Sequence, residues 1–123
     1  MNIEILIIES FGLSEKNIIS DEFIELNEDL MWLKEEVDYF VYLPSYMLWC
    51  IRNSDSNQNL VCDRTVSTIA EFGRYEGSEI THLKFKSRCS VIQRSVIVSF
   101  LNWVLVNTVV CNEEEIKRSL KRW

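Results

Sequence analysis

The sequence predicts a mostly α-helical protein, a compact single-domain helical bundle of five to six helices covering residues 1–123. Three observations lead to this prediction. The length suits one domain around one core, and the 47% hydrophobic and 26% charged residues are ordinary for a globular chain. The three glycines and one proline are few for an all-β fold, which turns often. Finally, apolar residues recur every three or four positions in several segments, as on one face of a helix.

The clearest helical pattern covers residues 20–37. Ser20 is a favourable N-cap, and Asp21 and Glu22 follow in the first turn, where the helix dipole favours negative charge. The pattern predicts one continuous helix. Its buried face would carry Phe23, Leu26, Leu30, Leu33 and Val37.

Glycine and proline mark the ends of other helices. Gly12 and Gly73 suit the C-termini of two of them. Pro44 suits the first position of a third, and it places Leu43 in an extended lead-in.

Two capping boxes are predicted near the C-terminal end of the chain. Ser90 with Gln93, and Asn112 with Glu115, have the required spacing. The first box opens an apolar helix with one narrow polar stripe, a pattern typical of a helix in the middle of a bundle. Besides 20–37, the predicted helices are residues 3–11, about 44–52, 61–72, 90–106 and 112 to near the C-terminus.

An α+β fold with one short edge strand is the alternative. That strand would lie near residues 3–8 or near residues 82–86, where the patterns also suit extended structure.

The stretch YFVYLPSYMLWC at residues 39–50 contains five aromatic residues and no charge. It is predicted to fill the core, because aromatic stripes in helices are most often buried. The alternative is a ligand groove lined by Tyr39, Tyr42, Tyr46 and Trp49.

Few residues could perform catalysis or hold a metal. His82 is the only histidine, and the four cysteines, at 50, 62, 89 and 111, lack the short spacings of zinc or redox motifs. A Cys89–His82 pair is the one nucleophilic dyad available. We therefore expect no enzyme, no cofactor and no metal; a hydrolase is a remote alternative.

The chain is expected to be cytoplasmic, with reduced cysteines and no membrane span. Glu4 and Glu9 interrupt the first apolar run, and no basic residue precedes it, unlike in an export signal. The segment from Val91 to Cys111 holds too many polar residues to lie in hydrocarbon.

Charge is distributed unevenly along the chain. Residues 1–38 hold eleven acids and two bases, a net charge of −9, whereas residues 84–123 hold three acids and eight bases, a net charge of +5. The basic residues between 84 and 94 could contact phosphates. A pI near 4.8 argues against that, so no nucleic-acid partner is expected.

The acids between residues 20 and 37 form the predicted partner-binding surface. On one continuous helix they would occupy three adjacent rows of the outer face, with Trp32 in the middle row. A solvated outer face is the simple interpretation. The functional interpretation is a docking surface for a basic protein, with carboxylates steering association and a tryptophan anchoring it. The predicted binding residues are Asp21, Glu22, Glu25, Glu28, Asp29, Trp32, Glu35 and Glu36.

Two patterns resemble those of known proteins. YLPSYM at 42–47 and QRSVIVSFLNWV at 93–104 resemble a group of small, uncharacterised bacterial domains, in which YLP and an aromatic–methionine pair precede a helix patterned Q-R-x-x-I-x-x-F-L. More broadly, a short acidic chain without an active site is similar to the immunity proteins of bacterial contact-dependent growth inhibition and other polymorphic toxin systems. That resemblance implies a protein that binds one cognate toxin domain, often a basic nuclease, and blocks it. A small-ligand or regulatory module using residues 39–50 is the alternative.

Overall fold

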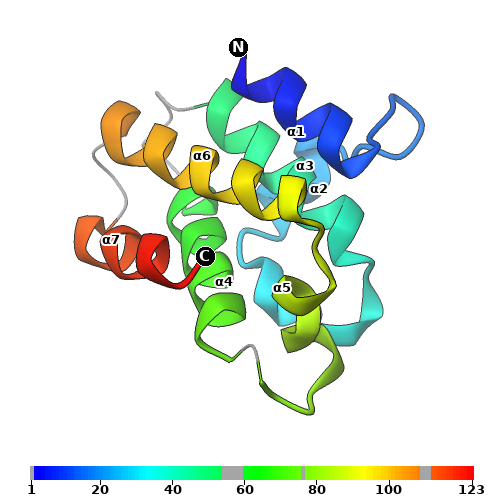
Figure 1. The fold of residues 1–123 in the computed structure, drawn as a ribbon. Coiled ribbons are helices and arrows are strands. Elements are labelled where there is room, and N and C mark those ends of the chain that lie inside the picture. Colours follow the sequence, from blue (N-terminus) through cyan, green and yellow to red (C-terminus); the bar gives the residue numbers. More distant parts are fainter. Residues whose placement is uncertain (1, 54–59, 76, 109–111) are drawn as a thin grey trace.

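Helices make up all the regular structure in the computed structural model, which describes residues 2–53, 60–75, 77–108 and 112–123 (Figure 1). The described residues contain no strand, which confirms the mostly α class. Residues 3–8 and 82–86, the two candidate edge strands, are helical, so the α+β alternative is wrong. The elements are α1 (Ile3–Phe11), α2 (Asp21–Leu26), η1 (Leu30–Glu36, 3-10), α3 (Tyr39–Arg52), α4 (Val61–Arg74), η2 (Thr81–Lys84, 3-10), α5 (Phe85–Arg88), α6 (Val91–Asn107) and α7 (Glu113–Arg122).

Helix α3 lies at the centre of the packing. It contacts α1, α2, η1 and α4, while α6 packs on α1, and α7 packs on both α4 and α6 (Figure 1). Every residue of α3 from Leu43 to Cys50 is buried. The prediction that the aromatic stretch fills the core is therefore confirmed.

The start of α3 differs from the prediction. Asp38 caps the helix, because its Oδ1 accepts a hydrogen bond from the Phe40 N–H at 2.9 Å. Pro44 consequently lies inside the helix, and Leu43 is helical rather than extended. Proline cannot donate to the carbonyl four residues earlier. The Ser45 hydroxyl adds a local bond in that turn by donating to the Val41 carbonyl at 2.7 Å.

The two predicted capping positions near the C-terminal end are occupied as expected, with one difference. Ser90 and Gln93 form a full capping box, with hydrogen bonds of 3.0 and 2.9 Å. Asn112 Oδ1 accepts from the Glu115 N–H at 3.2 Å. The Glu115 carboxylate does not return to Asn112; it accepts from the Ser67 hydroxyl of α4 at 2.9 Å.

The two glycines have different roles. Gly12 ends α1 with a φ of +64°, as predicted. Gly73 does not end a helix, because α4 continues to Arg74. A Cβ at position 73 would lie only 2.9 Å from Nε1 of Trp123, and this indole N–H donates to the Ile69 carbonyl at 3.0 Å. Gly73 therefore makes room for the end of the chain to pack on α4.

Helix α6 is not in the middle of the bundle. One face is buried, whereas Val91, Ile92 and Val106 are 85%, 69% and 81% exposed. The buried face consists of Val96, Ile97, Phe100, Leu101 and Val104.

None of the described helices alone is long and apolar enough to cross a membrane. The bent pair Thr81–Arg88 and Val91–Asn107 meets that test only when the two helices are taken together.

The cysteines agree with the prediction where they can be seen. Cys50 and Cys89 are buried free thiols, and Cys62 is buried as well. Cys111 lies outside the described residues.

Replacing Gly73 tests the packing of the C-terminus. Alanine favours a helix by about 1 kcal/mol over glycine. Nevertheless, we expect Gly73→Ala to lower the free energy of unfolding by about 1–2 kcal/mol, because the methyl group displaces the Trp123 indole. Urea denaturation measures the change.

Trp123→Ala supplies the control. In that background Gly73→Ala should become stabilising, by about 0.5–1 kcal/mol. Gly77→Ala, where a new Cβ meets no atom within 4 Å, should change stability by less than about 0.5 kcal/mol. A loss of stability from Gly73→Ala that persists without the indole would contradict this explanation.

Candidate partner-binding surface

The predicted helix over residues 20–37 is broken into two pieces, α2 and η1. Its start is as predicted, since Ser20 Oγ accepts from the Phe23 N–H at 3.2 Å. The α-helix then ends at Leu26, and η1 begins at Leu30. The three contiguous rows of carboxylates therefore do not form, and the prediction of one continuous acidic face is wrong.

Hydrogen bonds at Asn27 end α2. The Asn27 side-chain amide donates to the Phe23 carbonyl at 2.9 Å, and its backbone N–H donates to the Ile24 carbonyl at 3.1 Å. The Asn27 carbonyl accepts from the hydroxyl of Tyr46, a fully buried side chain of α3, at 2.6 Å. These bonds hold Asn27 in a non-helical conformation, with φ −129° and ψ 63°.

Two of the predicted binding residues have structural partners instead. Glu28 Oε2 accepts a hydrogen bond from the backbone N–H of Leu60 at 2.5 Å. Leu60 is the N-cap residue of α4, and its apolar side chain cannot accept a capping hydrogen bond. A carboxylate at that position also complements the helix dipole. Asp29 Oδ1 accepts from the Met31 N–H at 3.1 Å, and its Oδ2 lies 4.0 Å from the Arg64 guanidinium.

The acids of α2 are available to a partner. Asp21, Glu22 and Glu25 are exposed, and they form no ion pair with any residue that the structure describes. Leu26 follows them and is 77% exposed. Sequence reasoning missed Leu26 because the periodicity assigned it to the buried face, whereas the buried residue of α2 is Ile24.

Trp32 is the main exposed aromatic side chain of the surface, at 79%. It lines a hollow of about 250 Å³ together with Asp29, Met31 and Lys34. Lys34 has φ 47° and ψ −126°, a backbone conformation that a side chain with a Cβ rarely adopts. Backbone strain such as that at Lys34 is maintained only when the surrounding structure holds the residue in that conformation.

The structure thus brings together only part of the predicted set. Asp29 and Trp32 share one hollow, whereas Asp21, Glu22 and Glu25 lie on a separate helix. Glu36 is exposed at the end of η1. The side chain of Glu35 lies outside the described part of the chain.

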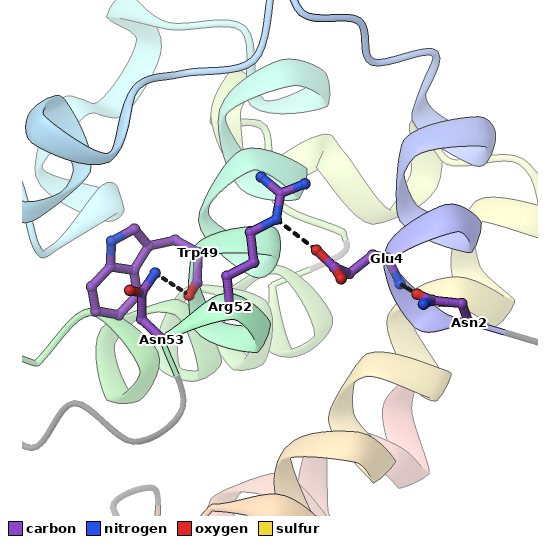
Figure 2. Close-up of polar contacts among 5 residues, drawn as sticks. All are labelled: Asn2, Glu4, Trp49, Arg52 and Asn53. Atoms are coloured by element: carbon purple, nitrogen blue, oxygen red, sulfur yellow. Dashed lines mark hydrogen bonds and ion pairs between the residues drawn. The ribbon is translucent and has the colours of Figure 1, made fainter.

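One acid of the first helix, Glu4, is paired within the fold. Figure 2 shows the Arg52 guanidinium of α3 paired with the Glu4 carboxylate of α1 at 2.6 Å. The same view shows Asn2 Oδ1 accepting from the Glu4 N–H at 2.7 Å, and so capping α1. Glu4 therefore joins α1 to α3, unlike the free acids of α2.

The basic residues of the C-terminal part also have internal contacts. The Lys86 ammonium donates to the Arg122 carbonyl, and the Arg88 guanidinium lies 5.1 Å from the centroid of the Phe40 ring. Lys117 pairs with Glu113 at 3.1 Å along α7.

The aromatic stretch does not form the alternative ligand groove. Tyr39, Tyr46 and Trp49 are buried, and Tyr42 is half-buried. Burial, with the Asp29 charge nearby, raises the pKa of Tyr39 to about 12. A cavity of about 80 Å³ lies at the start of α3, well below the roughly 300 Å³ of ordinary ligand pockets.

The candidate dyad lacks a reactive thiol. Burial raises the pKa of Cys89 to about 12, although Arg94 and Arg88 oppose the shift. The thiol is thus protonated at neutral pH and is a poor nucleophile. Within the described residues, no cluster of three or more histidine, cysteine or acidic side chains is placed to hold a metal ion.

Comparison of the chain with protein-family models, curated protein sequences and solved structures finds no match.

Tyr46→Phe tests the bond that ends α2. Removing the hydroxyl leaves the Asn27 carbonyl without this donor, and we expect a loss of about 1–2 kcal/mol in the free energy of unfolding. Tyr75→Phe, at an exposed position, should change stability by less than about 0.5 kcal/mol. Equal stabilities for the two variants would contradict the role of the Tyr46 hydroxyl.

Stability should fall at alkaline pH. The pKa of Cys89 is raised from 9.0 to about 12 in the folded state, so above pH 9 the unfolded state releases this proton while the folded state keeps it. The free energy of unfolding therefore decreases as the pH rises from about 9 to about 12. In urea titrations, Cys89→Ala should reduce this slope, and an unchanged slope would contradict the burial of the thiol.

Proposed function

We propose that the protein is a non-catalytic binding protein that docks a basic protein partner. The surface proposed for docking, called the acidic surface below, consists of Asp21, Glu22, Glu25, Leu26, Trp32 and Glu36. The proposal is carried by two exposed features: Trp32 is 79% exposed on η1, and Asp21, Glu22 and Glu25 of α2 are exposed and form no ion pair with any residue that the structure describes.

The chemistry of the acidic surface suits recognition of a cation. Unpaired carboxylates attract a positively charged protein over a distance of about one Debye length, roughly 8–10 Å at physiological salt, and so accelerate its association. Tryptophan is among the residues that dominate binding energy when a partner covers them. Leu26 adds apolar area at the end of the helix that carries the acids.

The particular role we propose is that of a cytoplasmic immunity protein, which binds a cognate bacterial toxin domain and blocks it. A nuclease is the class of toxin that this surface would suit, because a cleft that binds nucleic acid is basic. The small size, the net charge of −6 and the protonated, buried Cys89 support a role in binding over one in catalysis.

Charge reversal on α2 tests the steering role. The partner is first recovered by co-purification with the tagged chain from its native cells, identified, and prepared in pure form. Glu22→Lys with Glu25→Lys should then lower its association rate constant by about tenfold at low salt, and should weaken the dependence of that rate on ionic strength. Stopped-flow kinetics measure both quantities.

The matched control reverses two exposed acids elsewhere, Glu79→Lys with Glu114→Lys, and changes the net charge equally. Equal loss of association rate in both variants would show a general charge effect and contradict a docking site on α2. A partner without net positive charge would contradict the proposal itself.

Trp32→Ala tests the anchoring role. We expect the dissociation rate constant to rise about tenfold or more, with little change in the association rate, because Trp32 acts after the two proteins meet. The stability of the free protein should be almost unchanged, since Trp32 is mostly exposed. A variant that dissociates as slowly as the native protein would remove Trp32 from the surface.

A further inference from the structure

The outer face of α6 carries an exposed apolar surface that the proposed function does not use. One row along this face is formed by Val91, Ser95, Val98, Asn102 and Val106, which are spaced by three or four residues and therefore share one side of the helix. Val91 and Val106 are 85% and 81% exposed, and Ser95 and Asn102 are also exposed. No member of the row is charged. Solvent-facing helices ordinarily present charged side chains, so this row is unusual.

From this row we infer that the protein forms a homodimer, in which α6 packs antiparallel against α6 of a second copy. Its four exposed members, Val91, Ser95, Asn102 and Val106, are symmetric about the point between residues 98 and 99, where the half-buried Val98 lies next to Ser99 of the second copy. A two-fold axis there places Val91 opposite Val106 of the second copy, and Ser95 opposite Asn102 of the second copy. Apolar side chains thus meet apolar ones, and hydrogen-bonding side chains meet each other, which is the self-complementarity that a two-fold interface requires.

Charge along the row does not oppose a second copy. The protein carries a net charge of −6, and two copies repel each other only where acidic elements meet, whereas no residue of the row is charged. The row offers contact without opposing like charges. A charged partner would find no ionic complement along it.

The ends of the row add a second contact. Beside Val91 lies a groove of about 360 Å³ between α1 and α6, with Leu6, Ile92 and Val96 in its walls. The antiparallel arrangement brings Val106 of the second copy to this end of α6. One helix pair buries less than the roughly 1,200 Å² of a standard interface, so we expect a dissociation constant in the micromolar range.

Sedimentation velocity tests the dimer with the full chain. Between about 10 µM and about 1 mM, the native protein should shift from monomer to dimer. A monomer at the highest concentration would overturn the proposal.

Cysteine crosslinking tests the arrangement, in a Cys111→Ser background because the other native thiols are buried. Val98→Cys should form a disulfide-linked dimer with itself on mild oxidation. Val91→Cys should not, since its two copies would lie about 22 Å apart along the antiparallel helices. It should instead crosslink to Val106→Cys when the two variants are mixed. Arg118→Cys, exposed on α7, measures the rate of random collision. Self-crosslinking of Val91→Cys above that rate would overturn the antiparallel arrangement.

A charge pair confirms the register without oxidation. Ser95→Asp alone should weaken the dimer about tenfold, because it removes two carboxylates from water without giving either an opposing base. Adding Asn102→Lys should restore the dimer, since each new acid then faces a new base on the other copy. Circular dichroism verifies that all variants are folded. No restoration in a folded double variant would contradict the pairing of these positions.

The proposal is independent of the acidic surface. Charge reversal at Glu22 and Glu25 should leave the α6 dimer in place, and α6 variants should keep the binding of a basic partner by one copy.

Discussion

The hydrogen bond from the Tyr46 hydroxyl to the Asn27 carbonyl determines where the acidic segment stops being a helix. Tyr46 is fully buried in the central helix α3, and its hydroxyl needs a partner there. The last carbonyls of a helix have no intrahelical donor, so the Asn27 carbonyl, at the C-cap of α2, is free to accept this bond. The position of the break in turn sets the rest of the acidic segment. Glu28 and Asp29, in the break, contact the start of α4, and Trp32 lies exposed on η1 beyond it.

Local signals were sufficient for much of the fold. The capping residues Ser20, Ser90 and Asn112, and the left-handed Gly12, act through bonds to residues within five positions, so the sequence alone predicts them. The break after Leu26 depends on a bond across nineteen positions, and the role of Gly73 depends on an indole fifty positions away. Periodicity cannot reveal such contacts, because it describes one element at a time. The same limit explains why the sequence predicts one continuous acidic face that the structure does not form.

Burial separates the aromatic residues into two classes. Tyr39, Tyr46 and Trp49 pack in the core, where burial raises the pKa of both tyrosines. Trp32 lies on a short 3-10 helix with its ring in water. The described surface therefore presents two chemically distinct regions on different helices. One is acidic with an exposed indole, and the other, on α6, is uncharged and rich in valine. A protein with both can associate with itself and with a cationic partner by separate means.

Mapping the contact of a purified basic partner by NMR is the most direct test of the proposed docking surface. The backbone amide signals of the labelled chain would be followed as the partner is added. We predict that the largest changes fall on residues 21–26 and 30–36, and that they diminish at high salt because exposed carboxylates steer the association. Changes concentrated on α4 or α7, with residues 21–36 unaffected, would contradict the account.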